Sequence, residues 1–329
     1  MTATYPPSVA VFLTPEQQRA GLAADVRRGL DADVKWLPAK WLYDERGCDL
    51  FEQITALPEY YPNRAERTVL ATHADEMARW TGAGTLMELG SGTSDKTRRL
   101  LDALRDNRTL TKFVAFDVAE ATLRQSLADM GPHYPGVELA GVVGDFGAHL
   151  HHLPDGKGRM LALLGGTVGN LEPVDRQAFL HDVAGVLHGG EWFLVGADLV
   201  KDPRRLVAAY DDAAGVTAAF ETNVLAVVND ALGATFDLAR FRYFARWNVD
   251  YERIEMGVVS LGDQQVDVAA LGLTVALADG EEIRTELSCK FRVDGLAAEL
   301  DRAGMTLEQS WTDPDGDYAV CLARREDAS

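Results

Sequence analysis

The stretch Thr85–Val118, TLMELGSGTSDKTRRLLDALRDNRTLTKFVAFDV, decides the fold of this chain. A short apolar run, TLMEL, breaks at a Gly-Ser-Gly turn at residues 90–92, and a helix-like segment follows through Leu104. A second apolar run, FVAF, ends on Asp117. The turn brings bare backbone N–H groups to the start of a helix, where a ligand can approach closely. We interpret the stretch as strand, turn, helix and strand, with a nucleotide-type cofactor site at the carboxyl ends of the strands.

The glycine turn does not complete the dinucleotide fingerprint G-x-G-x-x-G, because Asp95 stands where the third glycine is expected. S-adenosylmethionine has no pyrophosphate to lay along the helix start, so the turn favours this cofactor over a dinucleotide. Asp117 can accept hydrogen bonds from ribose hydroxyls at the end of the next strand. A tight turn that binds no ligand is the alternative interpretation, and the position of Asp117 counts against it.

Composition restricts the class of protein. The 329 residues carry a formal net charge of −19, which repels phosphate backbones and anionic lipid. We therefore expect no nucleic-acid or membrane partner, whereas a small zwitterionic substrate is compatible with this charge. Cys48, Cys289 and Cys321 form no C-x-x-C motif, which argues against a zinc cluster and is typical of the reducing cytoplasm. The absence of a leader-like segment and of a long apolar stretch also predicts a cytoplasmic protein.

Strands and helices alternate through the middle of the chain, which predicts an α/β fold with a doubly wound sheet. Leu57–Arg67, which has a proline on each side of its two tyrosines, is predicted to be a structured loop. The predicted strands are Thr85–Leu89, the run ending at Asp117, Val137–Phe146, Arg159–Leu164 and Glu191–Leu199. The predicted helices are Pro15–Leu30, a short helix from Asp49 to Ala56, Ala65–Thr81, the segment through Leu104, Ala119–Gly131 and Arg176–Leu187.

Two further strand ends carry groups that suit a ligand. Asp145 could accept from the exocyclic amine of an adenine while Phe146 packs on the base, although a turn aspartate and a core phenylalanine explain the pair equally well. Gly165–Asn170, GGTVGN, offers hydrogen-bonding groups at the carboxyl edge of the sheet, where such loops often face substrate. A glycine turn with Asn170 in a left-handed conformation is the competing interpretation.

The alternation of strands and helices stops after the fifth strand. Asp202–Leu232 is almost entirely helix-forming, and Arg240–Ser288 is predicted to form antiparallel strands with a hairpin turn at Asp279-Gly280. These segments predict a second domain inserted into the α/β chain. A helix at Val293–Ala303 and a final strand pair, Met305–Trp311 with Tyr318–Ala323, are expected to complete the first domain.

Motifs spread over nearly the whole chain resemble the histidine-specific Nα-methyltransferases of ergothioneine biosynthesis. They are KWLYDERGCDLF, LPEYYPNRAE, ELGSGTSDKTR, FDV, GDF, GTVGNL, DLVKDPRRLVAAYDDAAGVTAAF, RIEM, ELSCKF and WTDPDGD. The resemblance implies a class I, Rossmann-like methyltransferase domain that binds S-adenosylmethionine, at residues 65–199 plus 290–325. It also implies an inserted α+β domain at residues 13–64 plus 200–289, with L-histidine bound between the two. The implied reaction is trimethylation of the histidine α-amino group to hercynine, and we expect a monomer.

The resemblance also implies the site residues. Asn170 and Tyr210 would hold the histidine carboxylate, and Tyr60, Glu286 and Ser288 would surround the imidazole. The donor would be held by Gly90, Lys96, Asp117, Asp145 and Phe146, with Lys96 one turn into the helix and paired with the donor carboxylate. The residues that would bind histidine are Tyr60, Gly165, Thr167, Asn170, Tyr210, Met256, Glu286, Leu287 and Ser288. Tyr43 would lie near the amine and is the candidate to pass its proton outward, because no strong base is evident there.

The chain departs from the family pattern at neighbours of these residues, namely Leu42, Gly47-Cys48 and Gly166. Three rival functions remain at this point. A nicotinamide-dependent oxidoreductase would also use Asp117, but it conflicts with the missing third glycine. A cofactor-binding regulator would not need the polar residues Asn170, Tyr210, Glu286 and Ser288. A methyltransferase for another amino acid is the third.

Overall fold

The computed structural model describes residues 6–327, which form two compact units. The first unit contains the chain up to Thr14, Ala65–Leu199 and the chain from Phe291 onward. The second unit contains Pro15–Arg64 and Val200–Lys290. Each unit is therefore assembled from segments that are far apart in the sequence, and each is described by itself below.

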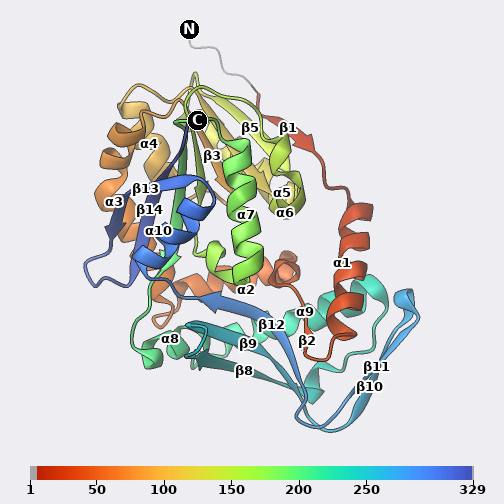
Figure 1. Cartoon of the computed structure of the whole chain (residues 1–329). Helices are drawn as coiled ribbons and strands as arrows, with labels where there is room; N and C mark the ends of the chain where they lie inside the picture. Colours follow the sequence, from red (N-terminus) through yellow and green to blue (C-terminus); the bar gives the residue numbers. More distant parts are fainter. Residues whose placement is uncertain (1–5, 328–329) are drawn as a thin grey trace. The chain divides into compact units, whose positions relative to one another are not determined.

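The first unit is built on an eight-stranded sheet in the order β1-β5-β4-β3-β6-β7-β14-β13 (Figure 1). Neighbouring strands are parallel from β1 to β7, and β14 is antiparallel to both of its neighbours. The chain order reverses between β3 and β6, which is the switch point where ligands of doubly wound sheets bind. The strands are β1 (Ser8–Val11), β3 (Thr85–Leu89), β4 (Lys112–Asp117), β5 (Glu138–Val143), β6 (Arg159–Leu163), β7 (Trp192–Asp198), β13 (Met305–Thr312) and β14 (Tyr318–Arg325).

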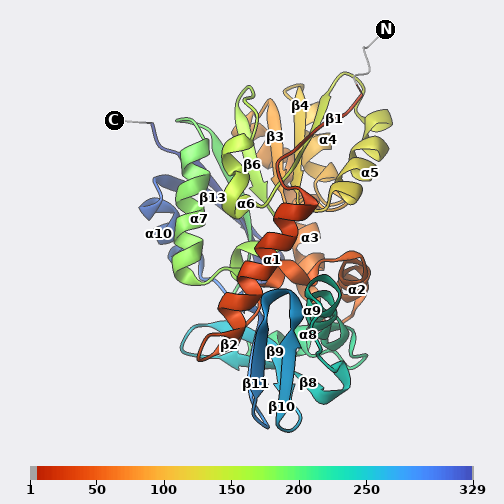
Figure 2. The ribbon, with the colours of Figure 1, turned by 90° about the vertical axis from the view of Figure 1, so that its right-hand side faces the viewer.

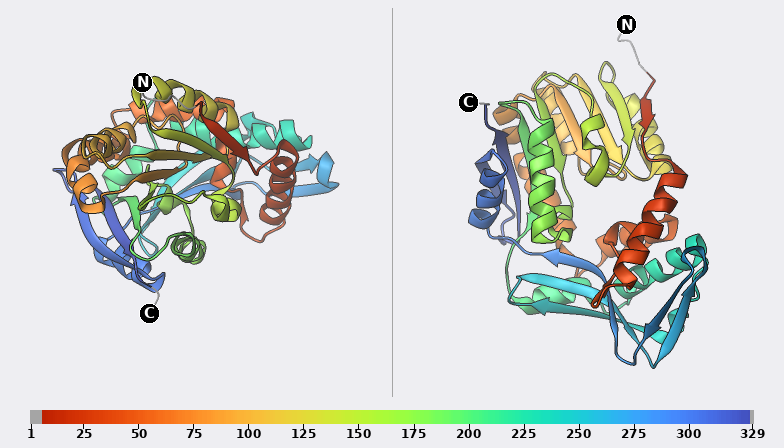
Figure 3. Two further views of the ribbon diagram at one scale, coloured as in Figure 1. Left: turned by 90° about the horizontal axis from the view of Figure 1, so that it is seen from above. Right: turned by 45° about the vertical axis from the view of Figure 1, so that its right-hand side comes forward.

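Helices cover both faces of this sheet. Seen from above, α4 and α5 lie on one face and α7 on the other (Figure 3). Because its two faces are both covered, the central strands β3 and β6 are buried at every position. The helices are α3 (Tyr61–Thr81), α4 (Arg98–Asp106), α5 (Glu120–Met130), α6 (Phe146–His149), α7 (Pro173–Val186) and α10 (Val293–Arg302), with a 3-10 turn η4 at Thr167–Asn170.

The second unit combines a four-stranded sheet, ordered β2-β12-β9-β8, with a two-stranded ribbon, β10-β11 (Figure 2). Helix α9 packs on β8, β9 and β12 and also contacts α1 and α2. Eight of the α9 side chains are buried, so this helix is the centre of the core of the unit. The helices are α1 (Pro15–Leu30), α2 (Glu45–Ala56), α8 (Pro203–Tyr210) and α9 (Val216–Leu232), and the strands are β2 (Lys35–Trp36), β8 (Phe241–Asn248), β9 (Arg253–Ser260), β10 (Gln264–Val268), β11 (Leu273–Leu277) and β12 (Glu282–Cys289).

Several predicted boundaries were wrong, each for a local reason. The predicted loop at Leu57–Arg67 contains the start of α3, because Pro62 stands in the first helical turn, where no backbone N–H is needed. Helix α2 begins at Glu45 instead of Asp49, since the Asp44 carboxylate accepts a hydrogen bond from the backbone N–H of Gly47 at 2.7 Å.

Further differences concern strand ends and helix breaks. The predicted third strand ends at Val143 and not at Phe146. The helix-forming stretch Asp202–Leu232 is divided into α8 and α9, because the Asp212 carboxylate accepts from the backbone N–H groups of Val216 and Thr217 at the start of α9. Strand β1, which extends the sheet beyond β5, was not predicted. Within residues 6–327, no helix is both long and apolar enough to cross a membrane.

Candidate active site

The glycine turn after β3 forms an open cradle. Gly90 and Gly92 have φ angles of 65° and 48°, a left-handed backbone that favours glycine. A Cβ atom at either position would meet no other atom within 4 Å, so space lies over the turn. Between them, the buried hydroxyl of Ser91 has no hydrogen-bond partner among the described residues. Open backbone and an orphaned hydroxyl are what a bound polar cofactor requires, so this turn fits the amino-acid end of S-adenosylmethionine.

Asp117 stands at the end of β4 and ties the turn to the sheet. One carboxylate oxygen accepts from the backbone N–H of Gly92 at 2.8 Å, and the other accepts from that of Ala119 at 2.9 Å. Burial raises the pKa of this carboxyl, whereas the two backbone hydrogen bonds lower it. A carboxylate has about four acceptor sites, so the two oxygens can still accept from ribose hydroxyls.

The prediction that Lys96 lies one turn into the helix was wrong. Lys96 lies in the turn before α4. Its Nζ donates to Glu66 at 2.5 Å. Glu66 is fully buried, and its other oxygen accepts from the backbone N–H of Gly165 at 2.7 Å and from the Tyr318 hydroxyl at 2.8 Å. Glu66 therefore connects the turn before α4, the glycine loop after β6 and strand β14. Sequence reasoning missed it, because a glutamate in a helix usually faces solvent.

Asp145 caps the short helix α6, and its carboxylate accepts from the backbone N–H of Gly147 at 2.8 Å. Phe146 packs edge-on against Phe179, with 5.4 Å between ring centroids. Both side chains are half-buried at the carboxyl edge of the sheet. The geometry leaves a part of each side chain accessible, as an adenine contact would need.

The loop after β6 turns sharply and then forms η4. Gly165 and Gly166 have φ angles of 84° and 73°. Gly166, which departs from the serine of the family pattern, therefore adopts a backbone that a serine would find strained. Thr167 donates through its hydroxyl to the carbonyl of Leu164 at 3.2 Å. Asn170 ends η4 and does not have a positive φ, which excludes the left-handed alternative for this residue.

In the second unit, three polar side chains form a compact cluster in a largely apolar core. The hydroxyls of Tyr210 and Ser288 are 2.9 Å apart. Lys290 donates to both, at 2.8 Å and 2.7 Å, and is itself only 4% exposed. The ring of Tyr60 meets that of Tyr210 edge-on at a centroid distance of 5.9 Å. Tyr60, Tyr210 and Ser288, which were predicted for the histidine site, lie together here, whereas Lys290 was not predicted, although it lies two residues after Ser288.

Glu286 and Ser288 lie two residues apart on β12, so their side chains point to the same face. Met256 on β9 is paired with Glu286 and is fully buried. Leu287 alternates to the opposite face, where it is buried. Any contact of Leu287 with a ligand beside Glu286 would therefore be made by its backbone.

Tyr43 follows the 3-10 turn η1 (Ala39–Leu42) and packs between two aromatic rings. The centroids of Phe51 and Phe220 lie 5.4 Å and 5.3 Å from its own, both edge-on. Burial, followed by the negative charge of Glu286, raises the pKa of Tyr43 well above 10. The phenol is thus neutral near pH 7, and it can relay a proton but cannot act as a strong base.

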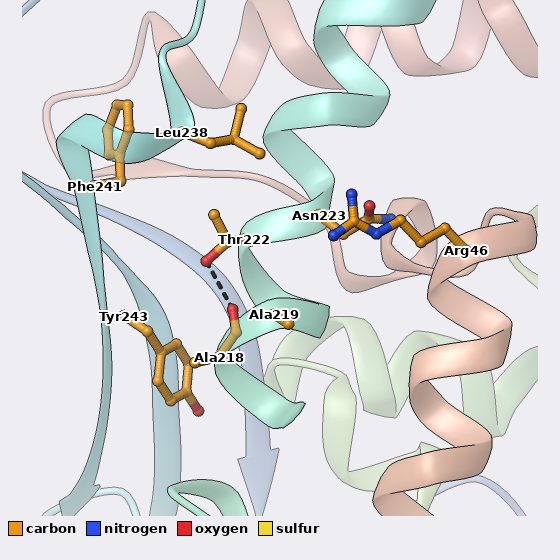
Figure 4. A pocket seen from close by; sticks show the side chains of 8 residues that line it. All are labelled: Arg46, Ala218, Ala219, Thr222, Asn223, Leu238, Phe241 and Tyr243. Atoms are coloured by element: carbon orange, nitrogen blue, oxygen red, sulfur yellow. Dashed lines mark hydrogen bonds between the residues drawn. The ribbon is translucent and has the colours of Figure 1, made fainter. Parts of the chain in front are cut away.

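A cavity of about 340 Å³ lies beside α9 in the same unit (Figure 4). Arg46, Thr222, Phe241 and Tyr243 are among its lining residues, and the Thr222 hydroxyl donates to the carbonyl of Ala218 at 2.7 Å. None of the predicted site residues lines this cavity. This cavity therefore does not mark the predicted site.

A doubly wound sheet with an open glycine cradle and an acid on the neighbouring strand defines the protein as a class I S-adenosylmethionine-dependent methyltransferase, which confirms the predicted fold class. The chain belongs to the family of histidine-specific, S-adenosylmethionine-dependent methyltransferases, whose model matches residues 22–325.

Individual relatives extend this result. The chain is 52% identical over 318 residues to the histidine N-alpha-methyltransferase of Mycolicibacterium smegmatis. The aligned region covers 97% of this chain and 99% of that protein. It is 32% identical over 286 residues to ergothioneine biosynthesis protein 1 of Neurospora crassa, covering 84% of this chain and 32% of that protein. It is also 27% identical over 350 residues to a 4-dimethylallyltryptophan N-methyltransferase of Aspergillus fumigatus, covering 98% and 99%.

Proposed function

We propose that this protein trimethylates the α-amino nitrogen of L-histidine with S-adenosylmethionine as donor, giving hercynine, the first step of ergothioneine biosynthesis. Family membership and the relative at 52% identity support histidine methylation. The structural observation that carries the proposal is the convergence of Tyr210, Ser288 and Lys290 in a largely apolar core, beside a strand that also contains Glu286. An apolar amino acid could not use the remaining hydrogen-bonding capacity of these groups, whereas the imidazole of histidine can donate or accept there and its carboxylate can accept.

On the donor side, when bound, S-adenosylmethionine supplies an electrophilic methyl carbon on a sulfonium centre. We assign Asp117 to its ribose hydroxyls, the backbone at Gly90 and the cation of Lys96 to its amino-acid end, and Asp145 with Phe146 to its adenine. These residues contribute orientation, which can supply a large part of the barrier reduction for a transfer between two bound reactants.

On the acceptor side, the assignments follow the resemblance to the histidine-specific methyltransferases. We assign Asn170 and Tyr210 to the histidine carboxylate. In the bond between Tyr210 and Ser288 only one hydroxyl can donate, so the proton of the other is directed at a different acceptor. In the proposed complex the carboxylate or the ring provides that acceptor.

The nucleophile is the neutral amine, because a protonated amine has no lone pair. A model α-amino group has a pKa of about 7.7–8.0, so a free amino acid is largely protonated at neutral pH. Tyr43, as a neutral phenol, can accept a hydrogen bond from the amine. The amine proton can then move to the Tyr43 oxygen while the hydroxyl proton of Tyr43 moves to water. The backbone at Gly165 and the Thr167 hydroxyl are assigned to the same amine, which must turn and lose a proton before each of three transfers.

We further propose a cytoplasmic monomer. Cys48, Cys289 and Cys321 form no disulfide within the described residues, which supports a reducing compartment. Analytical ultracentrifugation of the purified protein tests the monomer, and a sedimentation coefficient that increases with concentration would argue against it.

The deciding experiment is mass spectrometry of the purified protein incubated with S-adenosylmethionine and each of the twenty amino acids. Addition of three methyl groups to histidine alone is expected. Asp117→Ala, prepared in the same way, controls for a contaminating methyltransferase. Methylation of tryptophan instead would make this a methyltransferase for another amino acid, and no transfer to any amino acid would refute the proposal.

A further inference from the structure

A second carboxyl lies behind Glu286. Glu221, on the central helix α9, is fully buried. The hydroxyl of Thr285, on β12, donates to its Oε2. No N–H or O–H group of the described residues donates to its Oε1. A buried carboxylate oxygen without a donor is costly, so the state of this carboxyl needs an explanation.

The carboxyl of Glu286 lies close enough to Glu221 to act on its pKa, both through its charge and as a side-chain hydrogen-bonding partner. Two carboxylates cannot form such a bond unless a proton lies between them, because both would only accept. Burial raises the pKa of Glu221 well above its usual range, the charge of Glu286 and the contact with it raise the pKa further, and the bond from Thr285 lowers it.

The charge that acts on the pKa of Glu221 is the negative charge of Glu286, whereas the cation of Lys290 donates to Tyr210 and Ser288. The pair contributes to the raised pKa values of Tyr43, on the η1 side, and of Tyr243, on β8. Tyr243 also faces Asp211 and Asp212. Burial and the mutual repulsion of the two carboxylates oppose the ionisation of both carboxyls at once, so the pair favours one shared proton and one negative charge.

We propose that Glu221 is held protonated and donates a hydrogen bond to Glu286, so that Glu286 remains the single anionic acceptor for the imidazole N–H of the substrate. Glu221 is thus a positioning residue that determines ring specificity without touching the ring. This role rests on the proposed function, because it takes Glu286 as the imidazole ligand. The hydrogen bond from Glu221 occupies one acceptor position of the Glu286 carboxylate. The other acceptor positions of this carboxylate stay available for the substrate.

Two substitutions distinguish a protonated Glu221 carboxyl from an ionised one. In Glu221→Gln, the amide NH₂ can donate to Glu286 and the amide oxygen can accept from Thr285, so the variant copies the protonated acid. In Glu221→Met, the volume is kept but both hydrogen bonds are lost. We expect Glu221→Gln to retain the KM for histidine within about threefold, and Glu221→Met to raise it at least tenfold, about 1.4 kcal/mol. The KM for S-adenosylmethionine should change little in either variant.

Asp230→Asn is the matched control, because Asp230 is an exposed acid on the same helix. A tenfold loss of histidine affinity in Glu221→Gln, with a retained melting temperature, would show that Glu221 is ionised and would overturn the proposal. An unchanged KM in Glu221→Met would overturn it equally.

A direct readout needs no substrate. The infrared difference spectrum between wild type and Glu221→Gln at pH 7 should contain the carbonyl band of a protonated carboxyl. Glu88, whose pKa burial raises to about 7, is present in both proteins and cancels. If Glu221→Gln does not fold, Glu286→Gln serves instead, because it should shift the same band. Absence of the band from both difference spectra would refute the proposal, whereas its presence in a protein that does not methylate histidine would overturn only the proposed function.

Discussion

The Nζ of Lys96 lies 2.5 Å from a carboxylate oxygen of Glu66, whose side chain is fully buried in the first unit. The residue assigned to the donor carboxylate is thus already paired with an acid of the protein. This ion pair fixes the Lys96 cation beside the glycine turn. The contribution of Lys96 to stability can therefore be measured separately from its contribution to donor binding.

Lys96→Met should lower the free energy of unfolding by roughly 1.5–3 kcal/mol, because it removes a charged hydrogen bond from a buried carboxylate. Adding Glu66→Gln should restore most of this stability, since the remaining buried group is neutral. Affinity for S-adenosylhomocysteine should stay low in the double variant. Thermal unfolding and calorimetry measure the two quantities, and recovery of affinity together with stability would restrict Lys96 to a structural role.

Asp117→Ala should weaken S-adenosylhomocysteine binding at least tenfold, about 1.4 kcal/mol, because Asp117 is expected to bond both ribose hydroxyls. Titration calorimetry measures the affinity, and circular dichroism checks the fold, since this carboxylate also holds the backbone at Gly92. Asp106→Ala, at an exposed acid on α4, is the control. Equal affinities of a folded Asp117→Ala and the wild type would remove Asp117 from the donor site.

Activity should depend on pH through the substrate amine. The neutral fraction of the amine grows as pH rises through its pKa, so kcat/KM for histidine should rise and then level off. The pKa of Tyr43 is raised well above 10, so its phenol stays protonated and should add no falling limb below pH 9. A profile that is flat from pH 6 to 9 would contradict the neutral-amine mechanism, unless product release limits the rate.

Tyr43→Phe removes the hydroxyl and retains the ring that packs against Phe51 and Phe220. If the hydroxyl passes the amine proton outward, kcat should fall by more than KM rises. Steady-state kinetics with histidine varied at saturating S-adenosylmethionine separate the two constants. An increase in KM alone would make Tyr43 a binding residue.

Glu286→Ala should lower kcat/KM for histidine by one to two orders of magnitude, from loss of a charged hydrogen bond of roughly 1.5–3 kcal/mol. It also opens volume beside Met256, so relative activity on a larger aromatic amino acid such as tryptophan should increase. Glu282→Ala, at a half-exposed acid on the same strand, is the control. An unchanged ratio of the two activities would show that the ring pocket is elsewhere.

The parts of the site that lie on regular parallel strands could be predicted from the sequence. Gly90 and Asp117 stand at strand ends that periodicity already marks, and parallel strands bring their carboxyl ends to one edge. The motifs of the family then added Tyr210 and Ser288, which the structure brings within 2.9 Å although they are 78 positions apart.

The buried acids could not be predicted in this way. Glu66 meets Tyr318 across 252 positions, and Glu221 meets Thr285 across 64. Each acid lies in a helix in which most glutamates would face solvent, and helical periodicity does not give the face on which the partner lies. Lys290 was missed for the same reason, since its hydroxyl partner on Tyr210 is 80 positions away.

The order of the strands in the first sheet has a consequence for synthesis of the protein on the ribosome. Strand β14 lies inside the sheet, between β7 and β13, yet it is translated after all segments of the second unit. Until Tyr318–Arg325 leave the ribosome, the edge of β7 has no partner and the buried Glu66 lacks the Tyr318 hydroxyl. An unpaired strand edge is a site of aggregation. All segments of the second unit are therefore available for folding while one edge of the nascent first sheet is still unpaired.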